Sequence, residues 1–297
     1  MKRRWLGVAI ALLALPLFVL PTDSELGSPL VVDILGLIAF ASPALVGAYL
    51  VWRLPENAVG WFLAGFGLTF TLGVIGETNA VINSPLATWG AWLGAWLWAM
   101  SMTLIIILLP LRFPDGRLPS PRYRWVTPVA AVGCLLVIFG NAFRASIAFP
   151  TDDGEVVVDL PLHLPLPTAV FDVAAGFGLI LMLAAVGGAV LATIGRFRRS
   201  AGIERQQMKV FAGALAFSVT GMALNLVLYE VGNVSWANGV FALLVLVLVS
   251  SIALSVLRYR LYDFDRLVSR TVSYALVAGV LAAVYGFGAV WLPSQIV

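Results

Sequence analysis

Apolar runs of about twenty residues make up most of this chain, and a helix of that length crosses the ~30 Å hydrocarbon core of a bilayer. Hydrophobic residues are 61% of the total and charged residues only 11%. Lipid offers the backbone no hydrogen bonds, so only helices or a closed barrel can span it. Barrel strands alternate apolar and polar residues, whereas these runs are apolar on every side. We therefore predict an all-α fold, a polytopic transmembrane helix bundle.

We expect about nine spans within a single integral membrane domain that covers residues 1–297. The first run follows MKRR, as in a secretory signal, but the segment PTDSELGSP after it offers no small-x-small cleavage site. We therefore expect a retained first helix. The approximate bounds of the spans are 5–20, 30–52, 58–76, 86–110, 126–148, 167–195, 210–229, 237–257 and 272–292.

The basic residues predict the orientation of the bundle. With a cytoplasmic N-terminus, 17 of the 18 Lys and Arg residues fall in cytoplasmic segments, and only Arg144 lies toward the other side. The opposite arrangement would break the positive-inside bias. We therefore expect a multi-pass protein of the cell membrane with the lipid bilayer as its partner. The formal net charge of +3 is spread over short loops, which argues against nucleic-acid binding.

Few side chains in this sequence suit catalysis or metal binding. The one histidine, His163, has no second His or Cys near it to complete a metal site. The one cysteine, Cys134, lies inside an apolar run, so we expect no disulfide framework. The motifs GxxxxGK[ST], HExxH and GxSxG are missing. We therefore predict no catalytic residues, no metal, no cofactor and no enzyme activity.

Ionisable residues near the predicted outer ends of the spans form the candidate ligand-binding set. Charges within hydrocarbon are costly, so such residues usually face the bundle interior or water. An outward-open pocket in which Arg144 pairs with Asp172 or Glu77 would suit a small ligand or a proton signal. The alternative is that these side chains extend to the headgroups. The set comprises Asp33, Glu77, Arg144, Asp172 and Glu230.

The run WGAWLGAWLW, residues 89–98, carries four tryptophans and places Gly90 and Gly94 four apart. That spacing allows a second helix to approach closely. The alternative interpretation of the four indoles is an aromatic ligand site.

The segment RYRLYDFDRLVSR, residues 258–270, places six charges within thirteen residues. A helical register puts Leu261, Phe264 and Val268 on one face, which predicts a short amphipathic helix on the inner membrane surface. We expect this interfacial linker to cover about residues 258–271. Its candidate relay residues are Arg258, Arg260, Tyr262, Asp263, Asp265, Arg266 and Arg270.

Three cytoplasmic phrases carry a family resemblance: FPDGRLPSPRYR, RRSAGIERQQMK and RYRLYDFDRLVSRTVSYAL. In order and approximate spacing they resemble the N-terminal multi-span membrane region of actinobacterial-type sensor histidine kinases. The resemblance covers roughly residues 105–290 and implies a homodimer joined to a cytoplasmic kinase or other output domain. None of the matching positions is catalytic in that family.

The chain departs from this family because the sequence stops 27 residues beyond Arg270, which leaves no room for a phosphoacceptor histidine or an ATP-binding domain. We expect a truncated product, a fragment of a longer kinase or a free-standing input module. The resemblance implies a membrane input or anchoring module of a two-component signalling protein. The alternatives are a small-molecule permease and a membrane-embedded transferase.

Overall fold

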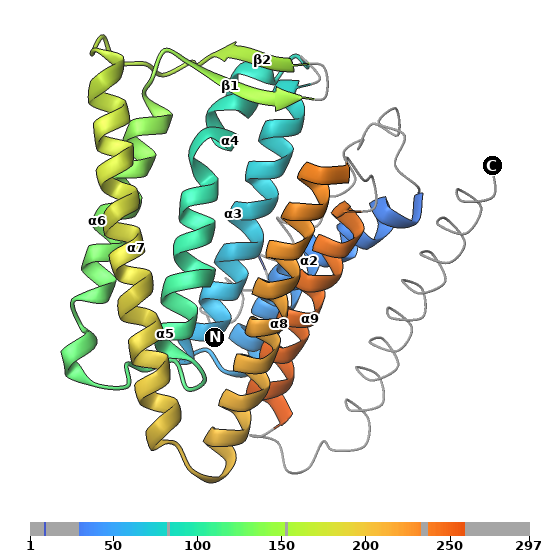
Figure 1. Ribbon diagram of the computed structural model, residues 1–297, viewed down its shortest axis with the longest axis vertical. Helices are drawn as coiled ribbons and strands as arrows, with labels where there is room; N and C mark the ends of the chain where they lie inside the picture. The colour runs from blue at the N-terminus through green and yellow to red at the C-terminus, as the bar shows by residue number, and fades with distance from the viewer. Residues whose placement is uncertain (1–8, 10–29, 82–83, 152–153, 233–236, 259–297) are drawn as a thin grey trace. The chain divides into compact units, whose positions relative to one another are not determined.

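The computed structural model describes residue 9 and residues 30–81, 84–151, 154–232 and 237–258. Most of these residues are helical, as predicted (Figure 1). The elements are α2 (Leu30–Arg53), α3 (Ala58–Val81), α4 (Ala87–Met102), the π-helical η3 (Thr103–Leu108), α5 (Leu109–Arg112), the 3-10 turn η4 (Pro121–Tyr123), α6 (Val126–Ala142), β1 (Ser146–Thr151), β2 (Gly154–Asp159), α7 (Thr168–Arg199), α8 (Gly202–Gly232) and α9 (Ala237–Arg258).

The chain divides into two compact units. The first comprises residues 1–22 and 40–200, and the second comprises residues 23–39 and 201–297. In the described residues the first unit contains α3 to α7 with the two strands, and the second contains α8 and α9. The boundary between the units falls within α2.

Four helical segments of the described chain are long and apolar enough to cross a membrane. They match four of the predicted spans, and α2, α8 and α9 are helices at three more of the predicted positions. The two remaining predicted spans, 5–20 and 272–292, lie outside the described residues. A total of nine spans therefore stays a prediction. The four segments are Ala58–Val81, Ala87–Arg112, Pro121–Ala142 and Thr168–Arg199.

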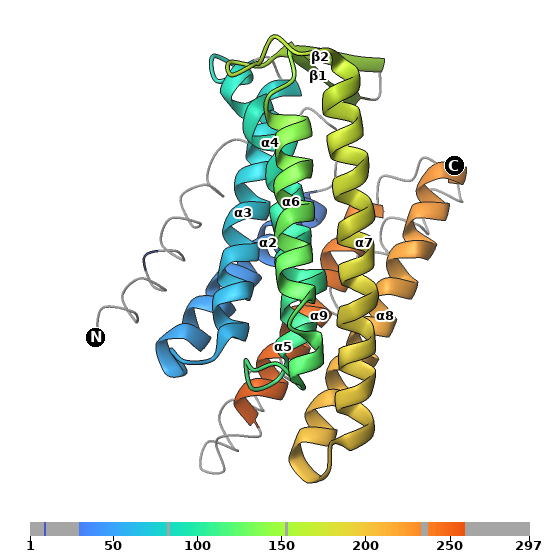
Figure 2. The same cartoon turned by 90° about the vertical axis from the view of Figure 1, so that its left-hand side faces the viewer.

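The first unit is a helical bundle in which α3 pairs with α4, α6 pairs with α7, and α4 contacts α6. The chain alternates in direction through α3, the continuous segment α4–α5, α6 and α7 (Figures 1 and 2). One end of this unit, the hairpin end, carries the two strands. The opposite end, the loop end, carries the loop of residues 113–125 between α5 and α6 together with the C-terminus of α7.

Glycines allow the backbones of α3 and α4 to approach closely. A β-carbon on Gly90 would lie 2.6 Å from the carbonyl oxygen of Gly76, and one on Gly94 would lie 3.1 Å from the backbone nitrogen of Glu77. This geometry confirms the close helix approach predicted from the spacing of Gly90 and Gly94. It places the tryptophan-rich helix α4 directly against α3.

A buried apolar core joins α4 and η3 to α6 and α7. Its members include Ile107, Val126, Val137, Met182 and Ala185, each less than a tenth exposed. Cys134 is part of this core, as expected for a thiol within an apolar run.

The two strands form an antiparallel hairpin that the sequence analysis missed. Ser146 lies opposite Asp159 and Phe149 lies opposite Val156. The predicted span 126–148 is too long, because α6 ends at Ala142. Judged by hydropathy alone, residues 146–149 continue the apolar span. The β-branched residues on both strands nevertheless favour the paired strand conformation. The described part of the chain is thus helical with one hairpin.

The hairpin packs on the ends of α3 and α4. Phe149 and Leu160 are buried against Ala80 of α3 and Ala91 of α4. Trp92 packs against this cluster, and its indole Nε1 donates a 3.0 Å hydrogen bond to the carbonyl oxygen of Ala142. These contacts hold α3, α4 and the end of α6 together beneath the strands.

In the second unit, α8 and α9 form an antiparallel pair. Gln207 near the start of α8 bonds to Ser255 near the end of α9, whereas Ser218 further along α8 bonds to Leu244, nearer the start of α9. α8 begins at Gly202.

Candidate functional site

Of the two partners considered for Arg144, the structure pairs it with Asp172 at the hairpin end. Arg144 Nη2 lies 2.7 Å from Asp172 Oδ1, and Arg144 Nε donates a 3.0 Å hydrogen bond to the carbonyl oxygen of Gly140. The Arg144 side chain is 24% exposed and that of Asp172 is 60% exposed. The pair joins the end of α6 to the first turns of α7 and remains open to solvent on the carboxylate side.

Glu77 does not join this pair. It lies on α3 with an exposed side chain, and within the described chain it makes no ion pair. For Asp33 in α2 and Glu230 in α8 only the helical backbone is described. The structure thus brings together two of the five residues in the candidate ligand-binding set.

The predicted relay linker lies almost wholly outside the described residues. Arg258 ends α9, and its backbone alone is described. The remaining relay residues lie outside the described part of the chain. These residues are Arg260, Tyr262, Asp263, Asp265, Arg266 and Arg270.

The helix that leads into this linker is fixed by a reciprocal contact in the second unit. Gln207 Nε2 donates a 2.7 Å hydrogen bond to the carbonyl oxygen of Ser255, and Ser255 Oγ donates to the carbonyl oxygen of Gln207 at 3.4 Å. Both residues are buried. Ser255 lies three positions before Arg258, so α8 holds the C-terminal turn of α9 just ahead of the linker.

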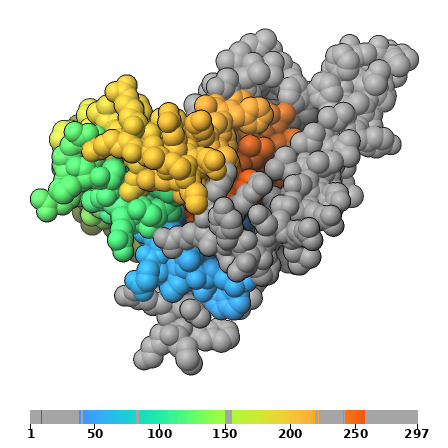
Figure 3. Space-filling model, turned by 90° about the horizontal axis from the view of Figure 1, so that it is seen from below, coloured from blue at the N-terminus to red at the C-terminus, as the bar shows by residue number. Residues whose placement is uncertain are grey.

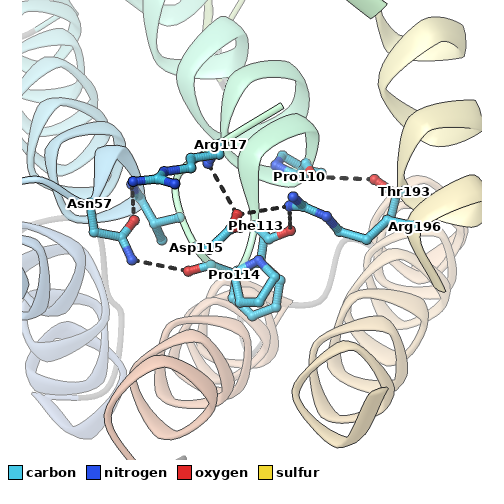
Figure 4. Close-up of polar contacts among 9 residues, drawn as sticks. Asn57, Pro110, Phe113, Pro114, Asp115, Arg117, Thr193 and Arg196 are labelled. Atoms are coloured by element: carbon cyan, nitrogen blue, oxygen red, sulfur yellow. Dashed lines mark hydrogen bonds and ion pairs between the residues drawn. The ribbon is translucent and has the colours of Figure 1, made fainter. Parts of the chain in front are cut away.

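A second polar cluster, at the loop end of the first unit, was not predicted. We call it the loop cluster, and it consists of Asn57, residues 113–117 and Arg196 (Figure 4). It connects the first turn of α3 to the last turn of α7 through the loop that follows α5. Figure 3 shows loop residues (green) and the end of α7 (gold) on this face of the molecule.

The Asn57 side chain links the loop to α3 through two hydrogen bonds. Its Oδ1 accepts a 3.0 Å hydrogen bond from the backbone N–H of Val59, the geometry of a helix N-cap. Its Nδ2 donates a 3.0 Å bond to the carbonyl oxygen of Pro114. Asn57 is 5% exposed, so both bonds lie out of water. One side chain therefore both caps a helix and binds the loop.

The Arg196 side chain links the same loop to α7 through a hydrogen bond and an ion pair. Its Nη1 donates a hydrogen bond to the carbonyl oxygen of Phe113 and lies 3.1 Å from Asp115 Oδ1. Asp115 Oδ1 also accepts a 3.1 Å bond from the backbone N–H of Arg117. Arg196 is only 9% exposed, so its charge depends on these partners for compensation.

Gly116 lets the loop lie against the start of α3. Its φ is +80°, in the left-handed region, and a β-carbon there would lie 2.6 Å from the backbone nitrogen of Ala58 and 2.7 Å from Asn57 Oδ1. Gly116 is the last residue of the Pro-Asp-Gly turn at residues 114–116. The glycine is therefore required by close packing as well as by the turn.

Neither cluster has the composition of a metal or redox centre. In the described part of the chain no group of three or more His, Cys, Asp or Glu residues is placed to hold a metal ion. The chemistry of both clusters is ionic pairing and hydrogen bonding. Such groups can bind a polar ligand. They can also exchange partners when the helices move between two arrangements.

Comparison with known proteins does not assign this chain to a family. No family model, no curated protein and no solved structure matches this chain.

Proposed function

We propose that this chain is the membrane-embedded input and anchoring module of a signal-transduction protein of the two-component sensor type. In this proposal the hairpin end faces outward and the loop end faces the cytoplasm, in agreement with the positive-inside bias. The module has no catalytic activity of its own.

The observation that carries the proposal is that α7 contributes to both polar clusters. Asp172 lies in its first turns and Arg196 in its last turn. At 1.5 Å per residue these positions are about 36 Å apart along one helix. A change at the exposed ion pair that shifts or tilts α7 would therefore alter the contacts of the loop cluster directly.

A ligand or membrane state that favours one position of α7 is sufficient for such a relay. A shift of about 1 Å is typical of helix movements in signalling transitions. It would lengthen the 3.1 Å contact between Arg196 and Asp115 to the limit of an ion pair. The output would then pass along the chain to α9 and the segment of residues 258–270.

The test uses a chimera in which a histidine kinase core of known activity follows Arg270 in helical register. Autophosphorylation is measured in membrane vesicles. We expect Asp172→Asn and Arg196→Gln each to change the basal rate several-fold. The matched control is Arg198→Gln, which removes the same charge from an exposed position of α7. If neither Asp172→Asn nor Arg196→Gln changes the autophosphorylation rate, α7 is not a relay.

The permease alternative is separated by uptake of radiolabelled solutes into proteoliposomes. The signalling proposal expects no substrate-dependent flux. A flux that Asp172→Asn abolishes would establish transport and overturn the proposal.

A further inference from the structure

Two arginines converge on one glycine at the loop end of the first unit. A β-carbon on Gly195 of α7 would lie 3.5 Å from Nη2 of Arg122 and 3.5 Å from Nη2 of Arg199. The two guanidinium groups therefore flank the same small space. Arg122 comes from η4 and Arg199 from the last turn of α7, so residues far apart in the sequence build this position.

Each arginine is held in place by neutral groups. Arg122 Nη2 donates a 2.9 Å hydrogen bond to Tyr123 Oη, and its guanidinium lies 4.8 Å from the centre of the Tyr123 ring. Tyr123 is buried, and its hydroxyl donates a 3.2 Å bond to the carbonyl oxygen of Leu191. Arg199 Nε donates a 3.0 Å bond to the carbonyl oxygen of Gly195. These contacts orient both groups while leaving other N–H donors available.

Neither arginine is paired with a carboxylate in the described chain. The neighbouring carboxylate in the loop, Asp115, is bound by Arg196. Two like charges placed together without an acidic partner repel each other. An anion between them would remove that repulsion, and the planar donors of arginine match phosphate oxygens.

An apolar surface adjoins the two arginines. Leu191 and Ile194 lie within a turn of Gly195 on α7 and are 61% and 44% exposed. The Trp125 ring would contact a β-carbon on Gly188, one further turn along the same face, and Trp125 is 45% exposed. The site thus has a charged end at the loop and an apolar flank that extends along the spans.

We propose that this position binds an anionic phospholipid, with its phosphate between Arg122 and Arg199 and its acyl chains along Trp125, Leu191 and Ile194. Inorganic phosphate would satisfy the arginines but not the apolar flank. A zwitterionic lipid with a choline headgroup would bring a third positive charge to the site. The site therefore selects an anionic headgroup attached to acyl chains. The proposed lipid site does not depend on the proposed signalling role.

The experiment is native mass spectrometry of the purified full chain in detergent. Phosphatidylglycerol and phosphatidylcholine with the same acyl chains are titrated separately. We expect phosphatidylglycerol to bind more tightly. Arg122→Gln or Arg199→Gln should weaken it about tenfold, as expected for the loss of one charge-assisted hydrogen bond. Arg198→Gln, an exposed arginine next to Arg199, should leave the affinity unchanged.

A variant that keeps every charge provides an independent check. Gly195→Leu would place a side chain between the guanidinium groups, and its β-carbon meets only ordinary contacts of 3.4–3.5 Å. We expect it also to lose phosphatidylglycerol while retaining the unfolding midpoint of the wild type.

Three results would overturn the proposal. The first is equal affinity for the two lipids, and the second is a loss with Arg198→Gln as large as that with Arg199→Gln. The third is displacement of phosphatidylglycerol by inorganic phosphate at the same phosphate concentration, which would show an anion site that does not select lipid.

Discussion

Replacing Gly116 with alanine tests whether the loop cluster holds α3 and the loop together. The substitution adds a single methyl group at a residue whose φ is +80°. The same change at Gly202 is the matched control. Gly202 also has a positive φ, +53°, but a β-carbon there would meet nothing within 4 Å.

The expected magnitudes follow from these two environments. A left-handed conformation costs a non-glycine residue roughly 1–2 kcal/mol, and this term applies to both positions. At Gly116 the new β-carbon would also lie 2.6 Å from the backbone nitrogen of Ala58, which cannot move without shifting α3. Overpacking of this kind costs roughly 1–3 kcal/mol. We therefore expect a destabilisation of about 2–5 kcal/mol at Gly116 and about 1–2 kcal/mol at Gly202.

The assay is unfolding of the purified chain from mild detergent by titration with sodium dodecyl sulfate, followed by far-ultraviolet circular dichroism. The free energy of unfolding of each variant is compared with that of the wild type. Equal losses for Gly116→Ala and Gly202→Ala would show that the loop does not pack closely on the start of α3. The packing inferred for the loop cluster would then be wrong.

Three further substitutions are checked by the same titration. Arg196→Gln should cost about 1.5–3 kcal/mol through loss of charge-assisted hydrogen bonds, and a loss below 0.5 kcal/mol would contradict the pairing. Gly90→Ala should destabilise by roughly 1–3 kcal/mol, because its β-carbon would lie 2.6 Å from a carbonyl oxygen of α3. Gly187→Ala is the control, because a β-carbon there meets nothing within 4 Å, and it should stabilise by about 0.5–1 kcal/mol. Equal effects of Gly90→Ala and Gly187→Ala would contradict the close packing of α3 and α4. Gln207→Leu should lose about 1 kcal/mol by removing the bond from its Nε2 to the carbonyl oxygen of Ser255, and an unchanged midpoint would argue against that contact.

Local patterns in the sequence predicted the helical class and one packing detail. Runs of apolar residues indicated helices at the four described spans because length and hydropathy suffice for that conclusion. The spacing of Gly90 and Gly94 indicated a close approach, and α3 provides it. The sequence left Asp172 and Glu77 as alternative partners of Arg144, and only the structure shows that Asp172 is the partner.

Long-range contacts could not be predicted in the same way. Arg196 and Phe113 are 83 positions apart, and Asn57 and Pro114 are 57 apart. Arg196 was interpreted only as a topology signal, since nothing near it in the sequence indicates burial. The hairpin was missed because residues 146–149 continue the apolar run that precedes them. A switch from helix to strand depends there on pairing with β2, which no local pattern reveals.

We propose that the first unit spans the membrane with its hairpin end outside and its loop end in the cytoplasm. Single cysteines at His163 and at Arg198, both exposed, test it directly in a chain whose own Cys134 is replaced by alanine. Intact cells are treated with a membrane-impermeant maleimide. We expect labelling at position 163 in intact cells and labelling at position 198 only after permeabilisation. Labelling of position 198 in intact cells would contradict it.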